Sequence, residues 1–279
     1  MSKPFPKRTI NSPVKVSGKG LFLGRPCEVI LEPAQAGAGI LIQTPVGDLA
    51  VSPDAVVESS NFTFLKKGDI QVFMVEHLFA ALHGLRVGNL LIRLSGEEMP
   101  ILDGSALPWA EAILHSGLVE QNEPWTTIEP AAPLAEYEGD HFLGAFPGSH
   151  LKIGYYFSHP HPHLGRAYFE WEYDEAGFVK DIAPARTFAT EQEWEALKGR
   201  GLAQAVTGGE GVLFTDRGPH TPLRFPNEPL RHKILDMLGD LFIAGVWLSG
   251  FVMGFRSGHL MNHRLAKQLA AMKSEGASA

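Results

Sequence analysis

The chain has 279 residues, of which 44% are hydrophobic and 20% are charged, with a net charge of −7 and a pI of about 5.9. This composition is typical of a globular protein with one large domain or two smaller ones. The acidic balance leaves no basic face for a phosphate backbone, so nucleic acid is excluded as an expected partner, whereas a small phosphate-bearing ligand is not.

The N-terminal stretch MSKPFPKRTI has no apolar segment typical of a secretory signal. Strand-like runs bounded by Gly, Pro or Asn follow at residues 12–18, 27–33, 39–45 and 61–67. The stretch VFMVEHLFAALHGL (72–85) has apolar residues at helical spacing and predicts a helix. A strand at 89–96 and a short helix at 107–117 complete the first half.

The polar stretch VEQNEPWTT (119–127) is interpreted as a linker. Beyond it we expect strands at 150–160 and 167–173, helices at 190–201 and 227–245, a strand at 246–258 and a helix at 257–272. Both halves therefore run in the order strands, helix, strand, helix. This weak repeat predicts an α+β fold of two similar domains, residues 1–122 and 127–279, each a strand-rich layer packed on helices, with a site between them.

Two features bear on the compartment. The only cysteine, Cys27, excludes an intrachain disulfide and a cysteine-based zinc site, and it favours a reducing environment. The longest apolar run, residues 241–255, is interrupted by three glycines and a serine and falls short of the ~20 residues of a membrane span. We expect a helix end, a glycine stop and a buried strand there, in a cytoplasmic, monomeric protein without a membrane span.

The helix expected at 227–245 carries an unusual polar stripe. Asn227 is expected to be its N-cap, followed by Pro229 in the first turn. His232, Asp236 and Asp240 follow at steps of four and, with Lys233, share one arc of the helix. A solvated polar face is the ordinary explanation. The sharper hypothesis is a metal site, because a His and an Asp one turn apart can bind one ion, and a catalytic zinc takes three protein ligands.

Other ionisable residues could complete such a site. Glu76 and His77 are adjacent in an otherwise apolar helix, where burial of a carboxylate is costly without a partner. His259 falls in the first turn of the last helix, after the potential cap Ser257, where a carboxylate such as Asp240 would stabilise its charged form. The ordinary alternatives are that His77 is a satisfied core histidine and that His259 and His263 are surface residues.

Five motifs occur in order along the chain: VEHL, ILDGSALPW, ARTF, LRF-x-NEPLRHKILDMLGDL and SGH-x-x-N. Together they resemble the zinc-dependent UDP-3-O-acyl-N-acetylglucosamine deacetylase family of lipid A biosynthesis, and the resemblance covers nearly the whole chain. The most specific motif is RHKILDxxGDL. The resemblance implies two similar α+β domains with the site between them, and hydrolysis of the N-acetyl group of a sugar nucleotide with release of acetate.

The resemblance also implies residue roles. The implied metal ligands are His77, His232 and Asp236, with zinc as the metal and ferrous iron as the alternative. The implied catalytic residues are Glu76 as general base, His259 as general acid, Asp240 as its orienting carboxylate, Lys233 as the active-site lysine and Thr187 as an oxyanion-binding residue. The implied substrate contacts are Phe188 at the start of the acyl passage, Phe157 near the nucleotide, and Asp103, which lies in a family motif.

These residue types suit amide hydrolysis. Zinc lowers the pKa of its bound water to about 7 and polarises the carbonyl group. Glu76 can take the proton of that water, and Thr187 can share the charge of the tetrahedral oxyanion. His259, kept protonated by Asp240, can give a proton to the leaving nitrogen.

Three positions depart from the family pattern. Phe22 stands where the family usually has a histidine, and His141 is the best match to a nucleotide-binding lysine. Glu191 follows ARTF, where the wall of the acyl passage is normally apolar. Because an ionised carboxylate in the wall would need desolvation when the chain enters, we expect a preference for shorter or hydroxylated acyl chains. The alternative is that the helix turns Glu191 toward water.

Two further hypotheses stay open. A zinc amidohydrolase could act on a related N-acetylated sugar nucleotide with a shorter acyl chain or none. A non-catalytic protein could bind a sugar nucleotide on the same fold, although Glu76 and His259 argue against this because binding requires neither. In all three readings the partner is a small-molecule sugar nucleotide.

Overall fold

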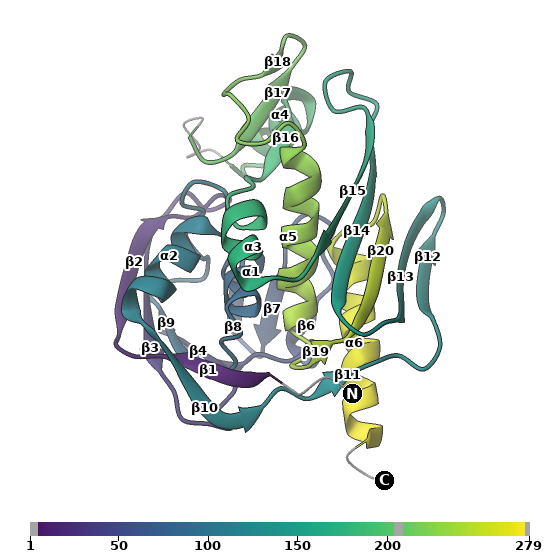
Figure 1. The fold of residues 1–279 in the computed structure, drawn as a ribbon. Helices are drawn as coiled ribbons and strands as arrows, with labels where there is room; N and C mark the ends of the chain where they lie inside the picture. The colour runs from purple at the N-terminus through teal and green to yellow at the C-terminus, as the bar shows by residue number, and fades with distance from the viewer. Residues whose placement is uncertain (1–4, 204–208, 277–279) are drawn as a thin grey trace.

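The computed structural model describes residues 5–203 and 209–276 (Figure 1). The elements of the first half are β1 (Pro6–Ile10), β2 (Val14–Lys19), β3 (Pro26–Pro33), β4 (Ile40–Thr44), β5 (Gly47–Ala50), the 3₁₀ turn η1 (Pro53–Ala55), β6 (Val56–Val57), β7 (Phe64–Lys67), β8 (Ile70–Phe73), α1 (Glu76–Gly84), β9 (Leu90–Leu94), α2 (Leu107–Ser116) and β10 (Leu118–Pro124).

The second half continues with β11 (Thr127–Ile128), β12 (Leu134–Glu138), β13 (His141–Pro147), β14 (Leu151–Ser158), β15 (Arg166–Glu172), α3 (Glu175–Gly177), the helical turn η2 (Phe178–Ile182), β16 (Phe188–Thr190), α4 (Glu191–Gly199), β17 (Val212–Thr215), β18 (Gly218–Pro219), α5 (Glu228–Phe242), β19 (Trp247–Leu248), β20 (Gly250–Phe255) and α6 (His259–Gly276). None of the helices in the described segments is long and apolar enough to span a membrane.

Two five-stranded sheets have the same strand order and directions. They are β2-β3-β9-β4-β5 and β12-β13-β20-β14-β15, and in each the central strand is antiparallel to one neighbour and parallel to the other. Each half also has a small three-stranded sheet, which follows the edge strand β5 or β15 in the sequence. This sheet is β6-β7-β8 in the first half and β16-β17-β18 in the second. The predicted duplication of an α+β unit is thus confirmed, and the domain limits 1–122 and 127–279 stay a prediction.

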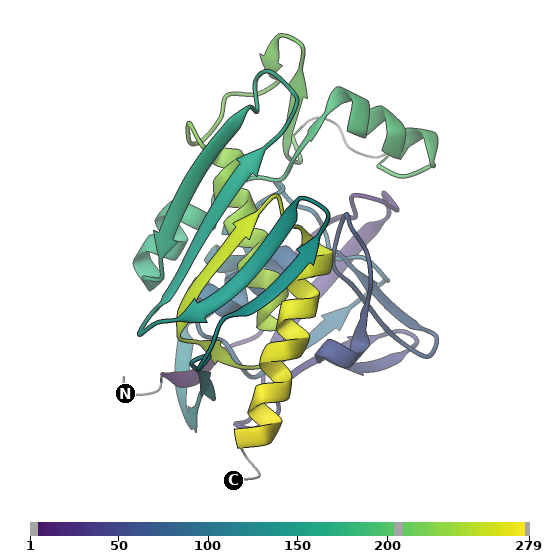
Figure 2. The same ribbon diagram turned by 90° about the vertical axis from the view of Figure 1, so that its right-hand side faces the viewer.

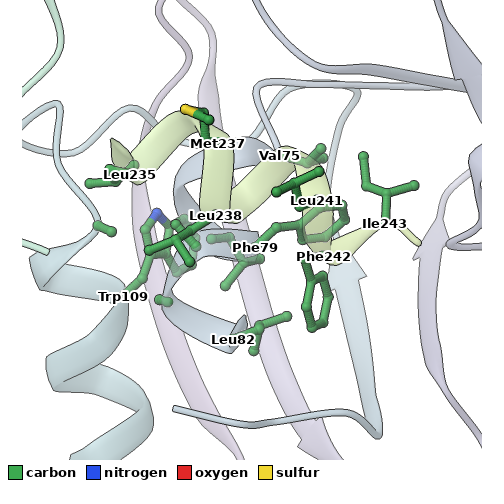
Figure 3. Packing of buried hydrophobic residues seen from close by; sticks show 14 of the residues in the cluster. Val75, Phe79, Leu82, Trp109, Leu235, Met237, Leu238, Leu241, Phe242 and Ile243 are labelled. Atoms are coloured by element: carbon green, nitrogen blue, oxygen red, sulfur yellow. The ribbon is translucent and has the colours of Figure 1, made fainter. Parts of the chain in front are cut away.

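Helices α1 and α5 lie between the two five-stranded sheets (Figure 1). The view in Figure 2 shows α6 beside the β12–β13 hairpin, at the edge of the second sheet. Apolar side chains of α1 and α5 meet in the centre, where the rings of Phe79 and Phe242 have centroids 5.4 Å apart (Figure 3). Burial of these side chains supplies the main stabilisation of the contact between the halves.

Gly239 permits the close approach of α1 and α5. A Cβ atom at this position would lie 2.1 Å from the backbone oxygen of Glu76, so any other residue would push the two helices apart. Because the helices touch here, His77 at the start of α1 reaches His232 and Asp236 in the first half of α5.

Two local expectations are wrong. Residues 118–124 form strand β10 rather than the start of a linker, and they pair antiparallel with β1. Their polar composition has a different cause, since Lys7 and Arg8 of β1 form ion pairs with Glu123 and Glu120 across this pair of strands. Asn227 occupies the N-cap position of α5 without capping it, because its Oδ1 instead accepts a hydrogen bond from Arg231 Nε at 2.8 Å.

Candidate active site

Residues from both halves line one cavity of about 750 Å³. Most of the predicted site residues contribute to its wall: Glu76, His77, His141, Phe157, Thr187, Phe188, His232, Lys233, Asp236 and His259. Asp240 lies next to this wall, bonded to His259. Segments far apart in the sequence therefore meet at one place.

His77, His232 and Asp236 form a compact buried cluster. One potential ligand atom from each lies within 4.8 Å of the others. The Nε2 atoms of His232 and His77 are 3.3 and 4.0 Å from Asp236 Oδ1. The three residues are only 2–4% exposed. The polar stripe of α5 is therefore buried here and is not a solvated helix face.

This donor set fits a divalent metal ion. His232 Nδ1 lies 3.0 Å from the carbonyl oxygen of Ala185, so Nδ1 carries the proton and Nε2 presents its lone pair on the side of the cluster. Burial lowers the pKa of His77 to about 3 and also lowers that of His232, which keeps both rings neutral, as a metal ligand must be. Two imidazole nitrogens and one carboxylate oxygen are an ordinary set for a catalytic zinc.

Lys233 supports the carboxylate of the cluster. Its Nζ donates to Asp236 Oδ2 at 3.0 Å and lies 5.6 Å from the centroid of the Phe188 ring. Burial disfavours the charge on Asp236, but His232 and Lys233 outweigh it and lower the pKa of this carboxyl group to about 2. Burial likewise opposes the charge on Lys233, and Asp236 outweighs it and raises the lysine pKa. The ammonium group therefore stays charged in the cavity wall.

Glu76 begins α1 and is 2% exposed. Its Oε2 accepts a hydrogen bond from the backbone N–H of Thr63 at 3.2 Å. Burial raises the pKa of Glu76 to about 8. Two residues earlier, Met74 has a φ of 62°, a left-handed conformation that is costly for a residue with a side chain and is often found next to functional groups.

His259 and Asp240 form a buried pair. His259 Nδ1 is 2.8 Å from Asp240 Oδ2, and Asp240 has no exposed surface. Burial opposes the imidazolium, but Asp240 outweighs it and raises the pKa of His259 to about 9. The alternative that His259 and His263 are surface residues is wrong, because they are only 6% and 2% exposed.

The ARTF loop is anchored by a buried ion pair. Arg186 donates from its backbone N–H and its Nε to Glu228 Oε1, at 3.0 and 2.8 Å. This contact joins the loop to the first residue of α5, so that the Ala185 carbonyl meets His232 and Thr187 faces the cavity. The backbone of Thr187 is held on both sides, by the carbonyl of Gly104 at 2.7 Å and the N–H of Val212 at 2.8 Å.

The aromatic residues of the predicted substrate region lie together. The ring centroids of Phe157 and Phe188 are 5.7 Å apart, and both side chains line the cavity, as does His141. Phe22 also lines it, and the centroid of its ring is 4.6 Å from that of Phe62, so this ring belongs to an apolar part of the wall.

Two predicted substrate contacts lie elsewhere. Glu191 is exposed and absent from the cavity wall, which favours the alternative that the helix turns this residue toward water. The reason is the orientation of α4: Glu193, Leu197 and Arg200 share the face that lines the cavity, and Glu191 falls on the opposite side. Asp103 also lies outside the wall, where it pairs with Arg224 at 2.8 Å and accepts hydrogen bonds from Ser105.

Three polar residues around Asp240 were missed as functional candidates. Asn262 Nδ2 donates to Asp240 Oδ2 at 2.8 Å, and Thr63 Oγ1 donates to Asp240 Oδ1 at 2.5 Å. His263 Nε2 lies 3.0 Å from the same threonine oxygen. Of the three, only Asn262 could have been identified from the sequence, because it belongs to the motif SGH-x-x-N. The expected cap Ser257 does not cap, since its Oγ is buried without a hydrogen-bond partner among the described residues.

Comparison with known proteins agrees with this geometry. The sequence model of a family described as UDP-3-O-acyl N-acetylglycosamine deacetylase matches residues 7–271. A UDP-3-O-acyl-N-acetylglucosamine deacetylase of Cellvibrio japonicus is 35% identical over 96% of this chain and 91% of its own length. Proteins of the same name from Geobacter sp. (strain M21) and Chlamydia pneumoniae are 35% and 36% identical over 94% of this chain, and over 88% and 96% of their own lengths. The chain therefore belongs to the UDP-3-O-acyl-N-acetylglucosamine deacetylase family.

Proposed function

We propose that this protein hydrolyses the N-acetyl group of UDP-3-O-acyl-N-acetylglucosamine and releases acetate, a step of lipid A biosynthesis. One observation carries the proposal: a single cavity wall joins a His–His–Asp donor set, the buried carboxylate Glu76 and the His259–Asp240 pair. A binding protein needs neither a buried base nor a paired acid, whereas metal-assisted amide hydrolysis uses a metal site, a base and an acid together.

We assign the metal site to His77, His232 and Asp236, with zinc as the ion and ferrous iron as the alternative. When bound, such an ion supplies a Lewis acid that polarises the acetyl carbonyl and acidifies water. The neutral imidazoles, the tautomer fixed by Ala185 and the ionised Asp236 support this assignment.

The chain itself moves the protons. Glu76 Oε2 is held by the Thr63 amide, so Oε1 is the oxygen that we assign to accept a proton from the attacking water. The charge that develops on the carbonyl oxygen is shared by Lys233 and Thr187. His259 Nδ1 is engaged by Asp240, which leaves Nε2 to donate a proton to the leaving nitrogen.

The rest of the cavity supports a substrate with an apolar arm and a nucleotide. We assign the acyl chain to the wall formed by Phe188, Trp194, Leu197 and Val212, and the nucleotide to the side of His141 and Phe157. Apolar side chains favour a hydrocarbon chain by roughly 0.8 kcal/mol for each methylene buried.

The test compares two substrates with purified protein, UDP-3-O-acyl-N-acetylglucosamine and UDP-N-acetylglucosamine without the acyl chain. We expect acetate and a free amine from the acylated substrate, at a much higher kcat/KM than from the other. Faster turnover of the substrate without acyl chain would favour the related amidohydrolase. Saturable binding of both without acetate release would leave only the binding-protein reading.

We further propose that the protein is a monomer and acts in the cytoplasm. One chain assembles the whole candidate site, and its single thiol, Cys27, is buried and free, which suits a reducing compartment. Light scattering after gel filtration should give a mass near the 30.4 kDa of one chain.

A further inference from the structure

Thr63 is fully buried in the loop before β7, and its polar atoms contact three separate parts of the site. Its N–H donates to Glu76 Oε2 at 3.2 Å, and its carbonyl oxygen accepts from the N–H of Met74 at 3.1 Å. Its Oγ1 is 2.5 Å from Asp240 Oδ1 and 3.0 Å from His263 Nε2. One residue of the first half therefore touches the proposed base and the carboxylate that holds the proposed acid.

The directions of these hydrogen bonds follow from the groups involved. An ionised carboxylate only accepts, so the Thr63 hydroxyl must donate to Asp240. The threonine oxygen can then only accept from His263, which places a proton on His263 Nε2. Nδ1 of His263 is buried and has no hydrogen-bond partner among the described residues.

Asp240 is consequently fixed at both oxygens. Oδ2 accepts from His259 and Asn262, each at 2.8 Å, and Oδ1 accepts from Thr63, with His263 Nε2 3.4 Å from the same oxygen. Asn262 and His259 both belong to α6, so they can move with that helix. Thr63 is the contact that ties the carboxylate to the first half of the chain, and through its own backbone to Glu76.

We propose that Thr63 is a positioning residue, whose hydroxyl and amide hold Asp240 and Glu76 in one fixed relation across the two halves. The inference rests on the proposed function, because the relative position of Glu76 and Asp240 matters for catalysis only if Glu76 is the base and His259 is the acid. His263 has a subordinate part: by donating to Oγ1 it turns the hydroxyl proton toward Asp240.

The main test is the variant Thr63→Val, which keeps the shape and the backbone amide and removes the hydroxyl. We expect kcat to fall by roughly 10- to 100-fold, the range for a lost hydrogen bond to a charged group, with KM and metal content close to those of the wild type. Thr63→Ser restores a hydroxyl and should recover most of kcat. The matched control is Thr9→Val, which removes another buried threonine hydroxyl that accepts from Ala34 N at 3.0 Å, far from the site, and should leave kcat unchanged.

A rise in KM or a loss of metal in Thr63→Val, with kcat per bound ion unchanged, would overturn the proposal and make Thr63 a purely structural residue. So would failure of Thr63→Ser to recover activity. A double-mutant cycle tests His263 separately. His263→Leu should lower kcat in the wild type and have no further effect in Thr63→Val. A larger effect in the variant background would show that His263 acts on Asp240 directly.

A measurement without turnover separates this inference from the proposed reaction. The His259 Nδ1 proton should give a downfield proton NMR resonance, identified by its absence in His259→Gln. We expect this resonance to shift in Thr63→Val, to return in Thr63→Ser and to stay in Thr9→Val. If the wild type releases no acetate, the proposed reaction fails and the resonance still decides the role of Thr63. An unchanged resonance in Thr63→Val would refute that role.

Discussion

His259 Nδ1 and Asp240 Oδ2 are 2.8 Å apart, and both residues are buried. In such surroundings the carboxylate stabilises the imidazolium far more than it would in water. The pair thus keeps a proton on a histidine that burial alone would deprotonate. This relationship determines the direction of the first prediction.

The rate should fall in alkaline solution. His259 must be protonated to act as an acid, and its pKa is about 9, since Asp240 outweighs the effect of burial. We therefore expect kcat/KM to be lost as the pH rises through about 9. In Asp240→Asn the histidine stays buried but loses the attractive charge, so its pKa falls and the alkaline limb should move to lower pH. A pH–rate profile of both proteins checks this, and an alkaline limb at the same pH in Asp240→Asn would remove His259 from the acid role.

Substitution of Glu76 should separate turnover from metal binding. Glu76→Gln keeps the size of the side chain and loses the base, so we expect kcat to fall by roughly 10²- to 10⁴-fold. Metal content should stay at the wild-type level, because the donor set does not include Glu76. Elemental analysis alongside steady-state kinetics measures both. Loss of the ion with normal activity per bound ion would instead make Glu76 a ligand.

The same residue should affect stability in a pH-dependent way. Burial raises the pKa of Glu76 from its ordinary value of 4.5 to about 8, so between these pH values the folded chain holds a proton that the unfolded chain releases. The free energy of unfolding of the metal-free wild type must then fall as the pH rises through this window. Glutamine does not ionise, so the free energy of unfolding of metal-free Glu76→Gln should rise relative to that of the wild type between pH 5 and 9. The rise should be several kcal/mol at most, since one pKa unit corresponds to about 1.4 kcal/mol.

Urea unfolding of both metal-free proteins at pH 5, 7 and 9 measures the difference. It should be smaller when metal is bound, because a nearby cation favours the carboxylate. A difference that is the same at all three pH values would mean that Glu76 titrates normally in the folded chain.

Metal retention should depend on His232. His232→Ala removes one of three donors, the ring nitrogen that lies 3.3 Å from Asp236 Oδ1, so we expect substoichiometric metal after purification. His115→Ala, which changes an exposed histidine of α2, is the matched control and should bind a full equivalent. Full metal content in His232→Ala would contradict the assignment of the site.

The parts of the site that could be predicted from sequence are those set by local geometry. The spacing of His232, Asp236 and Asp240 places them on one side of any helix, and the repeated element order predicts two similar units. Burial of this stripe was not predictable from the helix alone, because it results from the contact that Gly239 allows between α5 and α1.

Other features depend on how distant segments pack. The hydrogen bond between Thr63 and Asp240 joins residues 177 positions apart, and nothing in NFTFLKK distinguishes this threonine from one in an ordinary strand. The direction in which α4 presents Glu191 is likewise decided by the cavity against which the helix packs, and the short sequence around it is equally compatible with either side.

The exposed position of Glu191 changes the expectation for acyl chains. With no carboxylate from this residue in the wall, each added methylene should raise kcat/KM roughly fourfold until the passage is filled, the equivalent of about 0.8 kcal/mol. Glu191→Met should leave this dependence unchanged, because the side chain faces water.

Leu197→Asp places a further carboxylate on the face of α4 that lines the cavity. It should therefore flatten the dependence of kcat/KM on length for long chains and leave short chains unaffected. A series of acylated substrates on the three proteins measures this. If Glu191→Met alone increases the preference for long chains, Glu191 reaches the passage in the complex.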